Sequence, residues 1–394
     1  MLIHKFEKND NLGAIAERYF TNEEIIRKHN QLDKLPPAVG EEILVLTPTR
    51  TYTAKYGDSL DGIGLRFSIP KKDMEAMNPG LVGKELRPGD VIAIKCCDRP
   101  YGMSVANGYC YKDCTSEKLI EALPYLTYVT FSSVTADIGG FKRIFNDDAL
   151  LEIAKQAGKI PLLRVFDKYD KRYAGEDTDS FISKLVNLAK EKEYKGIVLN
   201  ACSMNEIPEE YTKFIVKLRG AMLGCDLILL TEINEDSPVE FSEYADASIM
   251  YYPKFAKSPV KSFEDGELKI LSDFAAEGES ARTFIDLPSV AMLGNEYIGT
   301  NDAINLARRG KCQISTNENT LLSHFRSKQG ECCYTSLSGI GKIFDLVNEL
   351  DYMGVCFDVM RSPRSHFSLY NALFKSYNQA TIRSVEGCSR GRGE

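Results

Sequence analysis

The chain has 394 residues, of which 43% are hydrophobic and 27% are charged, and its formal net charge at pH 7 is −7. A chain of this length exceeds one ordinary core and predicts about two to four folding units. The net negative charge argues against a nucleic-acid backbone as a partner, and the sequence has no run of about 18 apolar residues that could cross a membrane.

The N-terminus lacks the charged and then apolar pattern of an export signal, so we expect synthesis in the cytoplasm. The chain has eleven cysteines, and reduced thiols are the default in that compartment. Cys110 and Cys114 have a spacing that metal ligands can have, but no second pair of Cys or His follows at zinc-site spacing. We therefore expect no metal and no cofactor.

Residues 1–94 contain one pattern twice. The copies are offset by 48 residues at Asp10 and Asp58, and by 49 residues at Gly40 and Gly89, before the last apolar run. Each copy has a short alternating strand, a turn, two helical patterns and a closing strand, and Ser59 is placed to cap the first helix of the second copy. Self-similarity at this period predicts two small β-α-α-β domains.

Both copies resemble LysM domains, which bind polymers of N-acetylglucosamine such as peptidoglycan and chitin. We expect these domains at residues 1–47 and 51–95. Two tandem copies suit a polymer, because the second binding event is then intramolecular.

The resemblance also implies where the sugar lies, in a shallow groove between the first strand-helix turn and the loop before the last strand. An alternative for Asp58 and Asn78 is that they only hold turns together. The implied groove residues are Asn9, Asp10, Asn11, Leu12 and Asn30 in the first copy, and Gly57, Asp58, Ser59, Leu60, Asn78, Pro79 and Gly80 in the second.

After residue 100, apolar strand-like runs alternate with helical patterns. Eight such strands with crossover helices predict an α/β fold, a TIM (β/α)8 barrel over residues 101–380. Residues 299–335, before the last expected helix, are long enough to be an insertion at the rim that faces the sugar, and we expect 381–394 to be a disordered tail. The expected strands are 104–109, 128–133, 161–166, 196–201, 227–232, 247–252, 282–287 and 354–358, and the expected helices are 116–123, 147–157, 178–192, 208–223 and 338–350.

Four stretches of the barrel resemble the family-18 glycoside hydrolase barrel of spore-cortex lytic enzymes of the YaaH and SleL kind. They are residues 107–109, 123–128, 147–151 with 160–163, and 344–347 with 354–355. These enzymes also carry two N-terminal LysM domains. The resemblance implies an N-acetylglucosaminidase that cleaves peptidoglycan or cortex fragments during germination.

The catalytic motif of that family is altered here. In the family, a glutamic acid at the end of the fourth strand protonates the glycosidic oxygen, in the motif Asp-x-x-Asp-x-Asp-x-Glu. A cysteine thiol is a poorer proton donor to an ether-like oxygen than a tuned carboxylic acid, and an asparagine cannot ionise, so the sequence predicts that the acid catalyst is lost. The four positions are Lys195, Val198, Asn200 and Cys202.

Two further positions agree with a loss of catalysis. The sixth strand retains the family's tyrosine as Tyr252 but has Pro253 where the family has aspartate. The eighth strand has Asp358 where the family has the tryptophan that floors the sugar subsite, and the whole chain has no tryptophan.

A rival hypothesis moves the active site to acids at other strand ends, where TIM barrels keep their chemistry. Glu232 and Asp358 are the preferred pair, since two carboxyl groups about 5 to 9 Å apart can hydrolyse a glycoside. The acids at expected strand ends are Asp137, Asp167, Glu232, Asp286 and Asp358.

The sequence therefore favours a binding protein over an enzyme. We expect the LysM copies to hold an N-acetylglucosamine polymer of the spore coat or cortex, with other coat proteins as further partners and with neither nucleic acid nor membrane insertion. The alternative is an active N-acetylglucosaminidase with relocated acids. A third hypothesis is that the barrel oligomerises or is cross-linked through its thiols.

Overall fold

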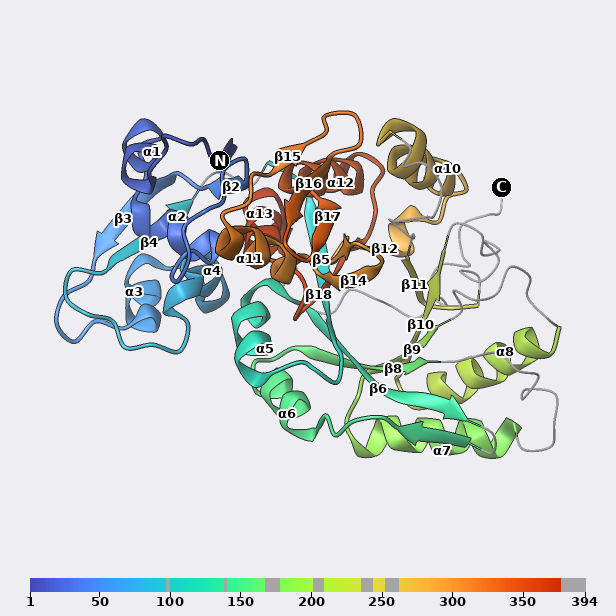
Figure 1. The fold of residues 1–394 in the computed structure, drawn as a ribbon. Helices are drawn as coiled ribbons and strands as arrows, with labels where there is room; N and C mark the ends of the chain where they lie inside the picture. Colours follow the sequence, from blue (N-terminus) through green and yellow to red (C-terminus); the bar gives the residue numbers. More distant parts are fainter. Residues whose placement is uncertain are drawn as a thin grey trace, which may run out of the picture.

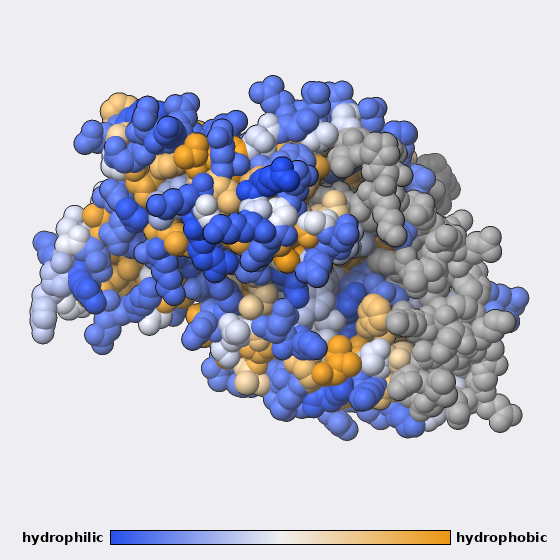
Figure 2. All heavy atoms as spheres, in the orientation of Figure 1, coloured by the Kyte–Doolittle hydropathy of each residue, from blue (hydrophilic) through white to orange (hydrophobic). Residues whose placement is uncertain are grey.

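The computed structural model of the protein describes residues 1–96, 100–137, 140–166, 178–200, 209–234, 244–251 and 262–376. Two small N-terminal units lie side by side, and a barrel with an inserted sheet packs against them (Figure 1). No helix among these residues is long and apolar enough to cross a membrane. On the side drawn in Figure 2 the described surface is mainly hydrophilic.

Each N-terminal unit has the expected β-α-α-β order. Asn11 and Ser59 cap the first helix of their unit, accepting hydrogen bonds from Ala14 N at 2.8 Å and Gly62 N at 3.1 Å. In each unit the two strands form an antiparallel pair. The elements are β1 (Leu2–Lys5), α1 (Leu12–Arg18), α2 (Glu23–Asn30) and β2 (Glu42–Val45) in the first, and β3 (Pro48–Thr53), α3 (Leu60–Phe67), α4 (Lys71–Met77), the 3-10 turn η1 (Pro79–Leu81) and β4 (Val91–Cys96) in the second.

Eight parallel strands close into a barrel, which confirms the predicted fold class. Each strand pairs with its neighbours in chain order, and the first pairs with both the second and the last, which closes the sheet. All eight expected strands are present. They are β5 (Met103–Cys110), β6 (Tyr128–Asp137), β8 (Ile160–Phe166), β9 (Gly196–Asn200), β10 (Ile228–Ile233), β11 (Ala247–Met250), β12 (Thr283–Asp286) and β18 (Gly354–Asp358).

The five expected barrel helices are present, and the described part of the barrel contains two more that were not expected. The prediction that 338–350 is the last helix was wrong, because α13 follows β18. Half of the residues of α13 are polar, which hid it from a search for an apolar face, yet the whole helix is buried. The helices are α5 (Ser116–Ala122), α6 (Asp148–Gln156), α7 (Thr178–Glu191), α8 (Glu209–Leu223) and α12 (Leu337–Glu349), with α10 (Lys269–Ala276) and α13 (Arg364–Leu373) in addition.

Short elements complete the barrel. Strand β7 extends the sheet antiparallel to β6, and β19 lies beside the start of β5. The two short strands are β7 (Gly140–Arg143) and β19 (Lys375–Ser376). The helical turns in the described part of the barrel are η2 (Leu123–Tyr125), η4 (Glu264–Leu268) and η5 (Ser280–Arg282).

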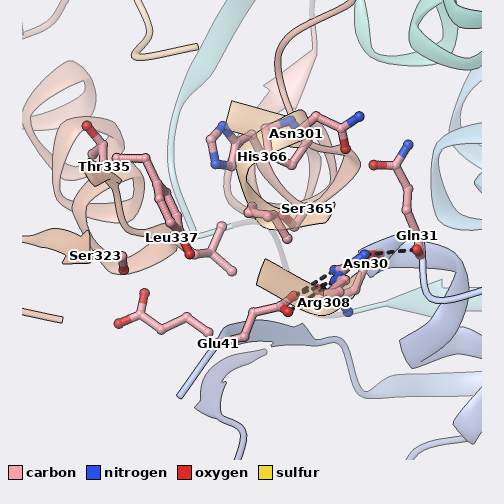
Figure 3. Close-up of a pocket in the computed structure, with 14 residues that line it drawn as sticks. Asn30, Gln31, Glu41, Asn301, Arg308, Ser323, Thr335, Leu337, Ser365 and His366 are labelled. Atoms are coloured by element: carbon pink, nitrogen blue, oxygen red, sulfur yellow. Dashed lines mark hydrogen bonds and ion pairs between the residues drawn. The ribbon is translucent and has the colours of Figure 1, made fainter. Parts of the chain in front are cut away.

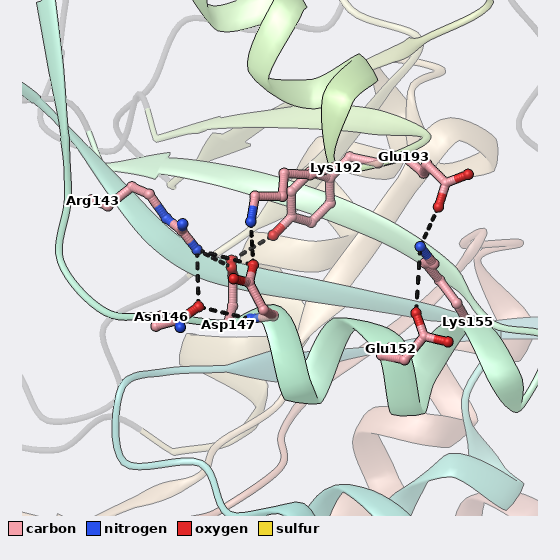
Figure 4. Close-up of polar contacts among 9 residues, drawn as sticks. Arg143, Asn146, Asp147, Glu152, Lys155, Lys192 and Glu193 are labelled. Atoms are coloured by element: carbon pink, nitrogen blue, oxygen red, sulfur yellow. Dashed lines mark hydrogen bonds and ion pairs between the residues drawn. The ribbon is translucent and has the colours of Figure 1, made fainter.

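The buried carboxylate of Asp147 anchors the start of α6. It accepts hydrogen bonds from Arg143 Nη2 at 2.6 Å and from the hydroxyl of Tyr194 at 2.5 Å (Figure 4). Beside it, Lys192 pairs with Asp148. These contacts tie β7 and α6 to the segment that leads into β9, which fixes the outer wall around the fourth barrel strand.

The inserted segment between β12 and α12 is a small domain in its own right. It begins at Val290, earlier than the expected 299, and forms a five-stranded antiparallel sheet covered by α11. Its elements are β13 (Val290–Leu293), β14 (Glu296–Gly299), α11 (Thr300–Gly310), β15 (Ser315–Thr316), β16 (Leu322–Ser327) and β17 (Gly330–Thr335).

A buried ion pair joins this insertion to the first N-terminal unit (Figure 3). Arg308 of α11 and Glu41 before β2 are 7% and 3% exposed, and Arg308 Nη2 lies 2.6 Å from Glu41 Oε1. Arg308 also donates to the carbonyl oxygens of Asn30 and Gln31 at 3.0 and 3.1 Å. The cavity beside the pair measures about 20 Å³, room for about one water molecule.

His29 links both N-terminal units to the barrel. Its Nδ1 lies 2.8 Å from Ser368 Oγ of α13, and its Nε2 lies 3.0 Å from the carbonyl oxygen of Met77 in the second unit. Burial lowers the pKa of His29 to about 3, so the imidazole is neutral at physiological pH. Three parts of the chain therefore meet at one uncharged side chain.

The Arg308→Ala variant should lower the free energy of unfolding by about 3–5 kcal/mol, because it leaves the Glu41 carboxylate buried without its counter-charge. Urea unfolding of the full chain measures this loss. Arg309→Ala is the matched control, since Arg309 is the exposed neighbour on the same helix and its loss should change little. An Arg308→Ala cost no larger than that of Arg309→Ala would contradict the importance of the pair.

Candidate functional site

Two adjoining cavities lie at the C-terminal ends of the barrel strands. Their volumes are about 500 and 250 Å³, and Tyr109, Tyr111, Tyr251 and Asp286 line both. The rings of Tyr109 and Tyr111 stack with centroids 5.9 Å apart. The larger cavity is further lined by Lys112, Asp113, Ser132, Ile144, Leu287, Ser289, Val290, Asp358 and Arg361, and the smaller by Arg164, Asn200, Glu232 and Ile249.

The smaller cavity contains a carboxylate held by four hydrogen bonds. Glu232 Oε1 accepts from Tyr109 Oη and from Arg164 Nε, both at 2.6 Å. Its Oε2 accepts from Arg164 Nη2 at 2.7 Å and from Asn200 Nδ2 at 2.5 Å. The side chain of Glu232 is 4% exposed, so both of its oxygens are enclosed by these donors.

The electrostatics keep Glu232 ionised. Burial alone raises its pKa, but the adjacent charge and hydrogen bonds of Arg164, with those of Tyr109 and Asn200, bring the pKa below its usual value of 4.5. Burial and the negative charge of Glu232 raise the pKa of Tyr109 well above its usual value, so the phenol stays a donor. A carboxylate in this state can accept protons in hydrogen bonds but cannot deliver one to a glycosidic oxygen.

The structure places three of the four altered motif positions, and Cys202 lies outside the described residues. Val198 and Asn200 both point into the barrel from β9, Val198 within an apolar layer and Asn200 toward Glu232. Lys195 precedes β9 and is exposed at the other end of the barrel. The motif strand therefore presents an aliphatic side chain and an amide to the interior.

Asp358, the other acid of the preferred rival pair, forms an ion pair with Arg361. Its Oδ1 accepts from the backbone N–H groups of Met360 and Arg361 at 2.9 Å, and its Oδ2 pairs with Arg361 Nη1 at 2.8 Å. Burial raises the pKa of Asp358, although Arg361 opposes the shift. Asp358 lines the larger cavity and Glu232 the smaller, so each acid has a separate environment.

Of the other barrel residues expected at the site, some are described by the structure and some are not. Asp286 lines both cavities from the end of β12. Tyr252, Asp167 and the side chain of Asp137 lie outside the described residues. Sequence analysis missed Arg164, although a lone arginine within the apolar strand 160–166 was a usable signal for a buried charge partner.

Equivalent asparagines in the two N-terminal units hold the fold together. Asn30 donates to the carbonyl oxygens of Ile26 and Leu44 and accepts from Leu44 N. Asn78 makes the same three bonds to Met74 and Ala93 in the second unit. Both amides are buried and fully used, which for Asn78 is the structural role that the sequence analysis left open as an alternative.

The turns that precede the first helices expose their matched residues to a similar degree in the two units. Asp10 and Asp58 accept from the backbone N–H groups of Glu7 and Lys55 at 2.8 Å, which is the turn-holding role considered for Asp58. The backbone hydrogen bond from Lys55 and the hydroxyl of Tyr52 lower the pKa of Asp58. Among the other implied groove residues, Leu12, Leu60 and Pro79 are buried, Gly80 is half-buried, and Asn9, Asn11, Gly57 and Ser59 are exposed.

Comparison with known families identifies the N-terminal units. The family model described as LysM domain matches residues 4–45 and 52–95. The chain carries two LysM domains. The matched segments coincide with the two β-α-α-β units, so the internal repeat and the family assignment agree.

A curated protein is similar in sequence to more than half of the chain. The putative sporulation-specific glycosylase YdhD of Bacillus subtilis (strain 168) is 23% identical over 243 residues, which cover 58% of this chain and 57% of YdhD. The chain therefore spans little more than half the length of that curated relative.

Solved structures show the fold of nearly the whole LysM protein. The spore cortex-lytic enzyme SleL of Bacillus megaterium QM B1551 is 19% identical, with a TM-score of 0.71 over 96% of this chain and 99% of SleL. A chitinase of Chromobacterium violaceum ATCC 12472 is 14% identical, with a TM-score of 0.58 over 68% of this chain and 98% of the chitinase. The barrel thus has the same fold as the barrels of SleL and of this chitinase.

The Glu232→Gln variant should lose about 3 kcal/mol of stability at pH 7, because it leaves Arg164 buried without its counter-charge. The folded-state pKa of Glu232 is depressed, so its contribution is present above pH 4.5 and is lost as the pH falls through the folded value. The difference in free energy of unfolding between wild type and variant should therefore decrease at acidic pH. Urea unfolding at a series of pH values measures this difference, with the exposed Glu210→Gln as control, and a difference that stays constant to pH 3 would contradict the ion pair.

Proposed function

We propose that this LysM protein binds a glycan of N-acetylglucosamine, the peptidoglycan of the spore cortex, without hydrolysing it. One observation carries the second half of the proposal. One acidic position of the family's motif, two residues before its glutamic acid, is here the Asn200 amide on β9, which is already bound to the ionised Glu232. A general acid has to arrive at the bond with its proton, and neither group can supply one.

The barrel keeps features that suit saccharide binding. Its larger cavity holds about 500 Å³ and is lined by tyrosine faces together with Lys112 and Arg361. Aromatic faces with a few directional polar groups are the usual lining of ligand sites. In this proposal the barrel holds a sugar next to the Glu232 cluster, and the LysM domains supply attachment to the polymer.

The proposed location is the spore. The names of YdhD and SleL refer to sporulation and to cortex lysis, and these two proteins resemble this chain over 58% and 96% of its length. Partners among other coat proteins are part of the same proposal.

A hydrolase with relocated acids is the second candidate function. Asp286 and Asp358 line the same cavity, and burial raises the pKa of Asp358, which is the direction that a general acid needs. Against it, both oxygens of Asp358 are occupied by Arg361 and two backbone N–H groups.

Purified protein should sediment with insoluble peptidoglycan and release no new reducing ends from peptidoglycan or chitin oligomers over a prolonged incubation. A cortex-lytic enzyme of the same fold serves as the positive control for release. Release that disappears in Asp358→Asn or in Glu232→Gln would replace the binding proposal with the hydrolase. Failure to sediment would overturn the proposed attachment through LysM domains.

A further inference from the structure

The two LysM domains provide an internal comparison, because one docks on the insertion and the other does not. In the first, the loop before β2 is covered: Ala38 is 4% exposed and lies in the core of the inserted sheet, and Glu41 is paired with Arg308. In the second, the counterpart of Ala38 is Arg87, offset by 49 residues, which is exposed. The same loop is therefore apolar and docked in one copy, and charged and open in the other.

Docking uses the backbone groups on that side of the first LysM domain. Arg308 donates hydrogen bonds to the carbonyl oxygens of Asn30 and Gln31. The side-chain oxygen of Gln31 accepts from the backbone N–H of Arg364 at 3.2 Å. Ile314 N donates to the carbonyl oxygen of Val39 at 2.8 Å. The loop that would form one wall of a sugar groove in this domain is thus bonded to the insertion and to α13.

The second LysM domain leaves most of the equivalent loop open. Only its first turn is covered, where Gly80 packs against Lys28 of the first domain. The following residues Lys84, Glu85 and Arg87 are exposed. Charged and flexible side chains along one wall can donate and accept hydrogen bonds to a saccharide, which the docked copy cannot do with its buried Ala38 and Glu41.

The opposite wall of the second domain carries an aromatic ring. Tyr56 is 95% exposed and lies in the turn between β3 and α3, where the first domain has Lys8. That turn is fixed, because Asp58 accepts from Lys55 N at 2.8 Å and from Tyr52 Oη at 2.8 Å. A ring held out by a rigid turn offers its face at little entropic cost.

We infer that glycan binding by the LysM domains is carried by the second copy alone, with a sugar ring stacked on Tyr56, while the first copy serves to dock the pair onto the barrel. The inference rests on the proposed function and specifies it. It gives one LysM site per chain, although the sequence contains two copies.

The absence of tryptophan from the chain gives a direct test. Tyr56→Trp places a single fluorescent ring at the proposed site, and Lys8→Trp places the matched ring in the first copy. Each full-length variant is titrated with chitin hexamer. The tryptophan fluorescence of Tyr56→Trp should change and reach saturation, and that of Lys8→Trp should stay unchanged. Tyr56→Ala should weaken sedimentation with insoluble peptidoglycan about tenfold, Tyr56→Trp should retain it, and Lys8→Ala should leave it unaltered.

The outcomes separate this inference from the function on which it rests. If wild type sediments but the Lys8→Trp reporter responds, or Tyr56→Ala binds as well as Lys8→Ala, the single-site inference is overturned and the glycan-binding proposal stands. If wild type does not sediment and neither reporter responds, both are overturned. Circular dichroism of each variant checks that a loss of binding does not come from a loss of fold.

Discussion

The ion pair between Arg164 and Glu232 is the constraint on which the chemistry of the barrel depends. Two opposite charges lie almost fully out of water, and each is acceptable there only because the other is present, with Tyr109 and Asn200 completing the hydrogen bonds. The four side chains come from the first, third, fourth and fifth barrel strands. The arrangement places an ionised carboxylate, held by four hydrogen bonds, inside the barrel beside Asn200 of the altered motif.

This pair also accounts for the shape of the surrounding site. Arg164 lies 5.9 Å from the ring of Tyr109, which stacks on Tyr111, and Tyr111 lies 5.4 Å below Arg361. Alternating cationic groups and aromatic faces make a continuous wall from the smaller cavity to the larger one. Such a wall suits a ligand with both apolar ring faces and hydroxyl groups, and it needs no reacting group to be useful.

Sequence patterns were sufficient to predict those elements that local, periodic residue patterns define. The eight strands were predictable because each is an apolar run of the right length, and the two LysM domains because a repeat is visible without any knowledge of contacts. Helix α13 escaped because Ser365, His366 and Ser368 are polar and become buried only through partners distant in sequence. The hydrogen bonds of Asn30 and Asn78 could not be predicted for a related reason, since a buried amide that joins helix to strand looks, in sequence, like a turn residue at a groove. The Arg164–Glu232 pair joins residues 68 positions apart, a separation that no local pattern encodes.

The joint at His29 has a mechanical consequence. Since one neutral ring bonds α13 on one side and the second LysM domain on the other, the attachment module and the barrel move together and are not linked by a loose tether. In the proposed function, a glycan held by the second LysM domain therefore lies at a fixed distance and orientation from the barrel mouth. Under that proposal, the barrel can engage only those positions of the polymer that lie at this fixed distance from the LysM site.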